Sequence, residues 1–380
     1  LTSPFSAGIS MLSALLQTLY EFKYPSISVL FLNVSIIILI FFFTDNIGIY
    51  VIPIGYLLGT FLQFCYLLYK SRKFFQLNLI THFRQFSLFK SLIGSSLAVI
   101  LLIESIGQLY SLLDRYFYGY ISSGGIASLN YAYIIFILPI SIFSISLSTV
   151  VFPKITQAII NVENKELERI YNESISINIF IFMPIAFILF YFGETIIKIA
   201  FERGKFIAES SIITYNALKC YSISLVFYAV YSVLNKIFYS INLAKILLVI
   251  TIAGILLKMT LNFLLVEQFQ QYGLAISTTI SYFFFFVVSY MIINKKLKIQ
   301  DKTLFLKDFL IYLTNCFICL LIVIILINIL ELKNLFIGIS MILCFTVIYL
   351  LNLLLLKHKS IVVINQVFER LNMGNIVKTT

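Results

Sequence analysis

Long uninterrupted runs of apolar residues recur along the chain and limit the folds that it can adopt. The run at 26–44, for example, contains no charged side chain. A membrane-spanning helix needs about 20 apolar residues to cross a hydrocarbon core of ~30 Å. Because every backbone N–H and C=O must be paired inside lipid, long continuous runs form helices, whereas a β-barrel needs short alternating segments. The sequence therefore predicts an all-α polytopic membrane protein.

We expect the chain to cross the bilayer about eleven times. Of its 380 residues, 61% are apolar and 11% are charged, and the mean hydropathy is +1.03. Soluble domains are nearer ~45–50% apolar and ~25% charged, so lipid must solvate much of this surface. The expected spans are residues 3–20, 26–44, 48–69, 88–113, 125–153, 173–193, 211–239, 245–266, 272–294, 308–330 and 334–356.

Basic residues are divided unevenly between alternate loops. Of the 27 Lys and Arg residues, 20 fall on one side of the predicted bilayer and five on the other, while Lys219 and Lys258 lie inside spans. Loops rich in Lys and Arg remain in the cytoplasm. The split predicts a cytoplasmic location for the loops at 70–90, 154–169 and 295–307 and for the C-terminus. It also indicates that the net charge of +11 reflects membrane orientation and not nucleic-acid binding.

A weak internal repeat indicates two related lobes. Tyr20 and Gly55 are 35 residues apart, and Tyr239 and Gly273 are 34 apart; each pair brackets a turn and an apolar helix. If spans one to three correspond to spans seven to nine, the first lobe is about three spans shorter than the second. The expected domains are the remainder of an N-terminal lobe at 1–75, a six-span C-terminal lobe at 76–300, and two additional spans with a cytoplasmic tail at 301–380.

No residue pattern in the sequence is typical of an enzyme or a metal centre. His82 and His358 lie in basic segments without a ligand partner at helical spacing, and the C-x-x-C at Cys316 and Cys319 has no second pair of ligands. A phosphate-binding glycine loop, an H-E-x-x-H pair and a serine elbow are also absent. We therefore expect transport without catalysis, metal or cofactor, and interpret the two cysteines as small core residues.

Polar side chains inside or at the ends of spans are the candidate site residues. An ionisable group at membrane depth costs ~2.5–3.5 kcal/mol on insertion scales and usually faces a cavity or a partner. One interpretation is a cationic cavity for an anionic substrate. The other is structural: Lys219 snorkels, Lys258 pairs with Glu104 or a carbonyl, and Asp114 pairs with Arg115 at the interface. These candidates are Glu104, Asp114, Arg115, Lys219, Lys258 and Asn262.

Three prolines fall within the predicted spans. Pro53, Pro139 and Pro184 each lack a backbone N–H, so a proline inside a helix removes a hydrogen bond and produces a kink. Kinks of this kind can act as hinges in transporters, or they can be packing features. The three prolines are therefore candidate hinges.

The segment 114–153 resembles a known family. Its sequence is DRYFYGYISSGGIASLNYAYIIFILPISIFSISLSTVVFP. It resembles the MurJ/MviN family of lipid II flippases, in which a polar residue and an Arg precede a glycine-containing loop, a Leu-Asn-Tyr-Ala helix, a Leu-Pro and a closing Phe-Pro. Further matches are FERGKF at Phe201–Phe206 and the Gly-Leu-Ala that begins at Gly273. Within this resemblance Asn130 is a further candidate substrate contact.

The resemblance implies a multidrug/oligosaccharidyl-lipid/polysaccharide exporter fold, similar to MATE transporters, with fourteen spans. The eleven spans here would be the fourth to the fourteenth. Two lobes would enclose a cationic cavity, and the last two spans would form a groove for an isoprenoid tail. By alternating access, a monomer would carry lipid II, an undecaprenyl-diphosphate-linked disaccharide-pentapeptide, to the outer leaflet of the bacterial inner membrane for peptidoglycan synthesis.

The sequence departs from the family pattern at Ile134, where the family commonly has an Arg. The family's other cavity arginines lie in the three spans that would precede residue 1. Lys258, Lys219 and Arg115 would then supply the positive charge. The alternatives are a flippase for another polyprenyl-linked glycan, a cation-coupled exporter of the same fold, or a truncated, non-functional homologue.

Overall fold

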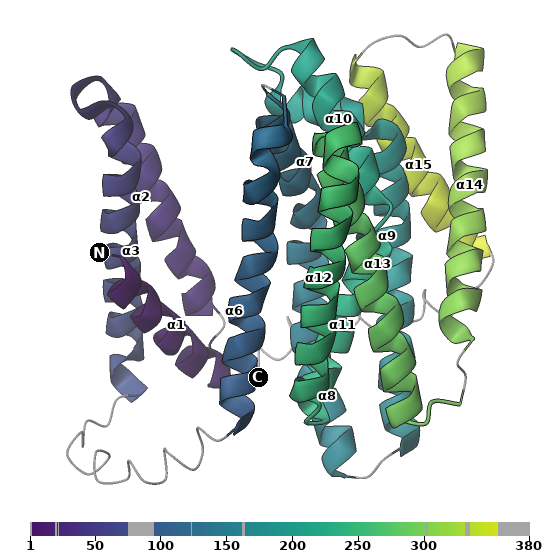
Figure 1. Ribbon diagram of the computed structural model, residues 1–380, viewed down its shortest axis with the longest axis horizontal. Coiled ribbons are helices and arrows are strands. Elements are labelled where there is room, and N and C mark those ends of the chain that lie inside the picture. Colours follow the sequence, from purple (N-terminus) through teal and green to yellow (C-terminus); the bar gives the residue numbers. More distant parts are fainter. Residues whose placement is uncertain are drawn as a thin grey trace, which may run out of the picture. The chain divides into compact units, whose positions relative to one another are not determined.

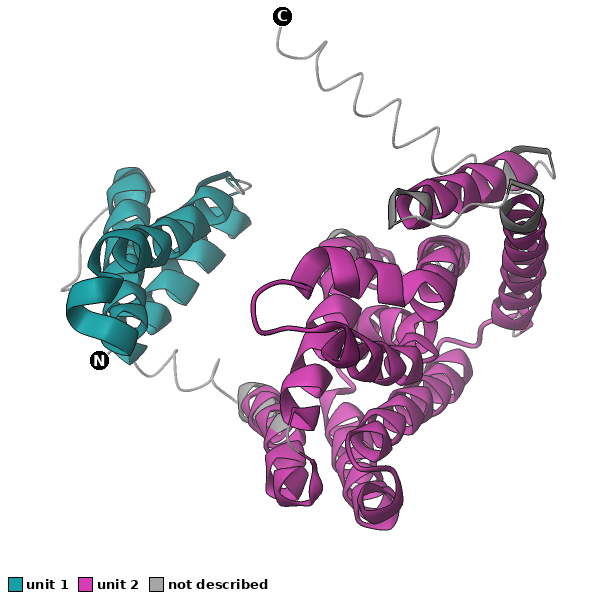
Figure 2. Cartoon of the chain, turned by 90° about the horizontal axis from the view of Figure 1, so that it is seen from above, with its two compact units in different colours: residues 1–92 teal, residues 93–380 magenta. Residues whose placement is uncertain are grey.

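The computed structural model describes residues 2–19, 21, 23–74, 95–122, 124–161, 164–300, 303–330 and 335–355. These ranges are almost entirely helical and contain no strand, which confirms the predicted all-α class (Figure 1). The chain divides into two compact units, Leu1–Leu92 and Ile93–Thr380 (Figure 2). The predicted domain boundary between residues 75 and 76 lies outside the described residues, as does Tyr20 of the predicted repeat.

Unit 1 is built around a tight helical hairpin. Gly59 of α3 allows the two helices of the hairpin to approach closely, because a Cβ atom there would lie 2.8 Å from the Leu32 Cα of α2. The Gln63 side chain donates a hydrogen bond of 3.2 Å to the Ser28 hydroxyl across the same interface. In its described part, unit 1 contains α1 (Ser3–Thr18), α2 (Lys23–Ile47), the 3₁₀ turn η1 (Gly48–Tyr50), α3 (Val51–Ser71) and the 3₁₀ turn η2 (Arg72–Phe74).

Unit 2 is a helical bundle in which α9, α10, α11 and α13 form the centre. The helix α6 packs mainly against α12 at one edge, and α14 and α15 pack against α9 at another (Figure 1). The described elements are α6 (Ser95–Tyr116), η3 (Phe117–Tyr120), α7 (Gly125–Pro139), the π-helix η4 (Ile140–Ser144), α8 (Ile145–Ile160), α9 (Asn164–Phe201), α10 (Ala208–Ser222), α11 (Leu225–Ser240), α12 (Ala244–Phe269), α13 (Gln271–Lys296), α14 (Leu304–Leu330) and α15 (Leu335–Leu355).

In both units a glycine lies where two helices of a hairpin approach each other closely. A Cβ atom on Gly273 of α13 would lie 2.5 Å from the Leu265 carbonyl oxygen of α12, and one on Gly55 of α3 would lie 3.0 Å from the Ile36 Cα of α2. Each glycine sits near the start of the second helix of a hairpin, and these are the two positions that the predicted internal repeat places in register. The two hairpins therefore share a packing device that requires glycine.

Gly273→Ala is expected to lower the stability of the α12–α13 hairpin, whereas Gly107→Ala is not. Overpacking costs ~1–3 kcal/mol where backbone atoms must move. Gly107 lies in α6 with nothing within 4 Å of its hypothetical Cβ, so alanine there should stabilise the helix by up to ~1 kcal/mol. Thermal unfolding of the two purified variants checks this. Equal effects would contradict the close approach.

Within the described residues, each of the eleven predicted spans overlaps one helix or a run of consecutive helical elements, and the first part of the span at 88–113 lies outside those residues. The span at 125–153 corresponds to α7 and α8 joined by the π-helix, and the span at 211–239 to α10 and α11, which are bent by 50°. By length and apolar composition, six helical segments of the described residues suffice to cross a membrane, or seven if the bent pair is one span; one segment, Lys23–Ser71, contains both α2 and α3. The count of eleven stays a prediction.

The faces that helices of unit 2 leave uncovered are strongly apolar. On α14, Leu321 and Ile325 are 58% and 55% exposed. Soluble proteins rarely expose contiguous apolar patches beyond a few hundred Å². Such faces are suited to contact with acyl chains.

The candidate hinge prolines occupy three different situations. Pro139 is the last residue of α7 and is followed by the π-helix, and Pro184 lies buried inside α9. A helical irregularity at Pro139 is expected because proline removes an intrahelical hydrogen bond. Pro53 instead lies in the first turn of α3, where the backbone N–H has no intrahelical partner. The kink predicted inside a helix at Pro53 is therefore wrong.

Candidate functional site

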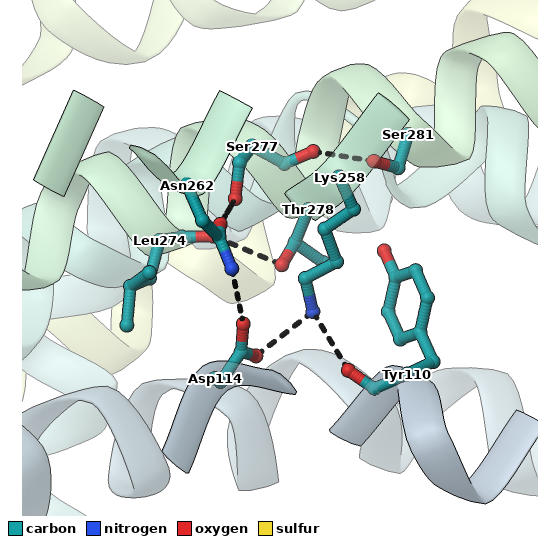
Figure 3. Close-up of polar contacts among 8 residues, drawn as sticks. All are labelled: Tyr110, Asp114, Lys258, Asn262, Leu274, Ser277, Thr278 and Ser281. Atoms are coloured by element: carbon teal, nitrogen blue, oxygen red, sulfur yellow. Dashed lines mark hydrogen bonds and ion pairs between the residues drawn. The ribbon is translucent and has the colours of Figure 1, made fainter. Parts of the chain in front are cut away.

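An ion pair connects α6 to α12 inside unit 2. The Lys258 ammonium Nζ lies 2.8 Å from Oδ2 of Asp114 and donates a second hydrogen bond of 3.3 Å to the Tyr110 carbonyl (Figure 3). It also lies 3.7 Å from the centroid of the Tyr110 ring. The Lys258 side chain is 1% exposed and that of Asp114 is 16% exposed. The ammonium is thus held by a carboxylate, a carbonyl and an aromatic face, which together offset its desolvation.

Asn262 joins the ion pair to α13. It follows Lys258 by one turn of α12, so the two side chains lie on the same face. Its Nδ2 donates a 3.1 Å hydrogen bond to Oδ1 of Asp114, and its Oδ1 accepts a hydrogen bond from Ser277 of α13. Both carboxylate oxygens of Asp114 therefore have a donor. The network ties three helices together through the paired side chains of Asp114, Lys258, Asn262 and Ser277.

A cavity of about 190 Å³ lies beside the ion pair. Its walls come from α6, η3, α7, α10, α12 and α13. Five of the lining side chains are tyrosines, so the walls combine aromatic faces with phenolic hydroxyl groups. We call this cavity the tyrosine pocket. It is lined by Tyr110, Asp114, Arg115, Tyr118, Leu129, Asn130, Tyr133, Tyr221, Lys258, Thr278 and Tyr282.

The tyrosine pocket has a buried end and an exposed end. Tyr221, Lys258 and Tyr282 are at most 5% exposed. Arg115 and Asn130 are exposed and form part of the opening. Because Asp114 neutralises Lys258, the positive charge that the lining contributes beyond that pair comes from Arg115. A ligand therefore meets a guanidinium at the opening and a nearly neutral, aromatic interior.

The structure brings together several of the residues that the sequence singled out. Asn262 contacts Asp114 beside the pocket, and the other members of this group line it. The ion pair joins Asp114 of α6 to Lys258 of α12, which is 144 residues later in the sequence. The lining residues that the sequence predicted are Asp114, Arg115, Asn130 and Lys258.

Other predicted site residues lie elsewhere. The Lys219 Nζ lies 4.1 Å from the centroid of the Tyr215 ring on its own helix, α10. Of the two predicted partners of Lys258, a backbone carbonyl is confirmed, that of Tyr110 at 3.3 Å. Glu104 is exposed on α6, and the acidic partner of Lys258 is Asp114. Ile134, the departure from the family pattern, is 49% exposed and lies outside the pocket lining. The predicted Asp114–Arg115 pair is likewise replaced by the pair between helices.

The lining tyrosines were not recognised from the sequence. Tyr110 precedes Asp114 by one helical turn, and Tyr282 follows Thr278 by one turn, so both tyrosines share a helix face with a polar lining residue. This spacing was an available signal. Tyr133 likewise follows Asn130 of the lining by three residues on α7, whereas the neighbours of Tyr221 at helical spacing are apolar or small.

Phe136 supports the aromatic wall from the protein interior. Its fully buried ring stacks on Tyr282, with centroids 6.0 Å apart and an interplanar angle of 10°. It also lies 5.4 Å from the Tyr221 ring. Aromatic pairs at these separations contribute beyond their buried area. With a centroid distance of 5.9 Å to Tyr133 as well, Phe136 contacts three of the five lining tyrosines.

Known relatives match most of this chain. A protein of Borreliella burgdorferi named as a probable lipid II flippase MurJ is 28% identical over 304 residues, covering 76% of this chain and 57% of the relative. A protein of the same name from Buchnera aphidicola subsp. Schizaphis graminum is 28% identical over 307 residues, covering 79% and 58%. The chain thus spans less than two thirds of the length of these relatives.

Solved structures agree on the fold. A lipid II flippase MurJ in an inward closed conformation superposes with a TM-score of 0.71 at 23% identity, covering 91% of this chain and 70% of that one. An inward-facing MATE family multidrug transporter gives 0.63 at 15% identity, covering 78% and 69%. This chain therefore has the fold that these two transporters share. The family model described as lipid II flippase MurJ matches residues 4–346, and this multi-pass chain accordingly belongs to the MurJ lipid II flippase family.

Proposed function

We propose that this chain moves lipid II from the cytoplasmic to the outer leaflet by alternating access and so supports peptidoglycan synthesis. The observation that carries the proposal is the family match over residues 4–346. As a member of that family, the chain is a multi-pass protein of the bacterial inner membrane. The proposed partners are lipid II and bulk membrane lipid, the proposed unit is a monomer, and the role is transport without catalysis.

The tyrosine pocket is the proposed contact for part of the lipid II headgroup. Arg115 is exposed at its opening, where a guanidinium can bind a phosphate through charge-assisted hydrogen bonds. Asn130 adds an amide that can donate and accept. Lys258 and Asn262 would then act by holding Asp114, and with it α6, in place beside the pocket.

Depleted cells provide the test of function. In bacteria whose own flippase is removed, expression of this chain is expected to restore exposure of lipid II at the outer leaflet, measured by labelling from outside intact cells. The same assay with another polyprenyl-linked glycan measures selectivity. Insertion of the chain without any restored exposure would overturn the proposal.

Orientation is proposed from the charge distribution, with the basic loops and the C-terminus in the cytoplasm. In a background with the five native cysteines replaced, Arg203→Cys should react with a membrane-impermeant maleimide in intact cells, because Arg203 lies in the loop assigned to the outer side. Lys298→Cys should react only after lysis. Both positions are exposed in loops between helices. The reversed labelling pattern would contradict the orientation.

A further inference from the structure

We propose that the buried end of the tyrosine pocket binds a sugar ring of the substrate, while the phosphate groups stay at its opening. This inference rests on the proposed function and deepens it by assigning one chemical group to each end of the pocket. The ligand class is a neutral, hydroxylated pyranose such as an N-acetylhexosamine.

Charge excludes a phosphate from the buried end. The Lys258 ammonium is 2.8 Å from the Asp114 carboxylate and is also engaged by the Tyr110 carbonyl and ring. A phosphate that approached Lys258 would approach the Asp114 carboxylate as well, and repulsion at this separation is strong where water is excluded. The Arg115 guanidinium is outside this pair and is exposed. An anion is therefore favoured at the opening alone.

The interior walls suit a sugar ring. Pyranose rings have apolar C–H faces that stack on aromatic rings, and hydroxyl groups at their edge that need polar partners. Tyr110 and Tyr282 stack on each other with centroids 5.9 Å apart, so they contribute ring edges and hydroxyls to the pocket. Tyr133 meets Tyr221 at 70° with centroids 5.8 Å apart and is 38% exposed, so part of its ring is accessible to the C–H face of a sugar. Phenolic hydroxyls combine an apolar body with a polar tip in a single side chain.

Polar groups at fixed positions complete the match. Thr278 donates its hydroxyl hydrogen to the Leu274 carbonyl at 2.9 Å, so its oxygen is left to accept a hydrogen bond from a ligand hydroxyl. At the opening, the amide of Asn130 can both donate and accept, so it suits an N-acetyl substituent that extends outwards from a ring in the buried end. The cavity of about 190 Å³ is smaller than the ~300–1,000 Å³ of pockets that hold drug-sized ligands. One ring, and not a disaccharide, is the fitting occupant.

Saturation-transfer NMR on the full chain in lipid nanodiscs tests the assignment. The probe is methyl N-acetyl-β-glucosaminide, and the competitor is inorganic pyrophosphate. Saturation is expected on the ring C–H protons, and pyrophosphate should not displace the sugar. Tyr133→Ala should weaken binding by up to about tenfold, whereas Tyr133→Phe should retain most of it. The matched control is Tyr56→Ala in unit 1, since Tyr56 is 44% exposed and Tyr133 is 38% exposed.

Each outcome bears on one claim. Absence of saturation transfer, displacement of the sugar by pyrophosphate, or equal binding by Tyr133→Ala and Tyr56→Ala would overturn the sugar assignment. The measurement involves no transport, so sugar binding by a chain that fails to expose lipid II would overturn the proposed function alone. Restored lipid II exposure without sugar binding would overturn the assignment alone.

Discussion

Lys258→Met is expected to destabilise unit 2 by about 3 kcal/mol, because it leaves the Asp114 carboxylate without its cation. This lies at the lower end of the range for breaking a buried pair, since 16% of the Asp114 side chain is exposed and partly solvated. Denaturant unfolding of the purified chain measures the change. The same substitution should reduce lipid II translocation while leaving membrane insertion intact, because α6 loses its anchor beside the pocket.

The double variant Lys258→Met with Asp114→Asn tests whether the stability contributions of the two residues are coupled. The Asp114→Asn change removes the uncompensated charge but keeps an oxygen that accepts from Asn262, so the double variant should regain most of the lost stability. Lys219→Met is the control, because Lys219 is only partly buried against Tyr215, and little change is expected. If the stability changes of Lys258→Met and Asp114→Asn, each measured alone, simply add in the double variant, the pair is not coupled. Unchanged translocation in Lys258→Met would make Lys258 a structural residue alone.

Phe136→Ala is expected to have the second large effect. Its ring is fully buried and stacks on Tyr282, and truncating a buried Phe costs ~3–5 kcal/mol through lost contacts and the cavity left behind. Loss of packing is the relevant term in a membrane protein, because lipid is itself apolar. The freed tyrosine rings should also lose their positions in the pocket wall.

Phe143→Ala in the neighbouring π-helix is the matched control. Phe143 is 45% exposed, so its truncation should change stability far less. Thermal unfolding of both variants in the same detergent gives the comparison. A similar loss in the two variants would contradict the view that the aromatic cluster around Phe136 stabilises unit 2.

Helix positions could be predicted from the sequence because apolar runs and the need to pair the backbone in lipid are local constraints. The run at 245–266 corresponds to α12 and that at 272–294 to α13. An irregularity at Pro139 could be predicted, but its form as a π-helix and the 50° bend between α10 and α11 could not, since each depends on neighbouring helices. Ser144, the last residue of the π-helix, donates to the Ala229 carbonyl of α11 at 2.9 Å.

The candidate site was predictable only in part. The separation of Lys258 and Asn262 by one turn fixed their common face, and the cost of a charge at membrane depth required a partner for Lys258. Whether Glu104 or Asp114 lies opposite Lys258 depends on the axial register between α6 and α12. Glu104 and Asp114 both lie on α6, and the tertiary register selects Asp114. The tyrosines were missed because 24 of them are spread along the chain, and aromatic residues at span ends are ordinary interfacial anchors.

The most direct test of the central claim is lipid II translocation by the purified chain in sealed vesicles. Fluorescent lipid II placed in one leaflet should become accessible to an impermeant quencher or enzyme in the opposite leaflet when the wild-type chain is present. The rate should fall in vesicles that contain Lys258→Met at equal protein content. Translocation no faster than in protein-free vesicles, with the wild-type chain folded and inserted, would contradict the proposal that this chain moves lipid II.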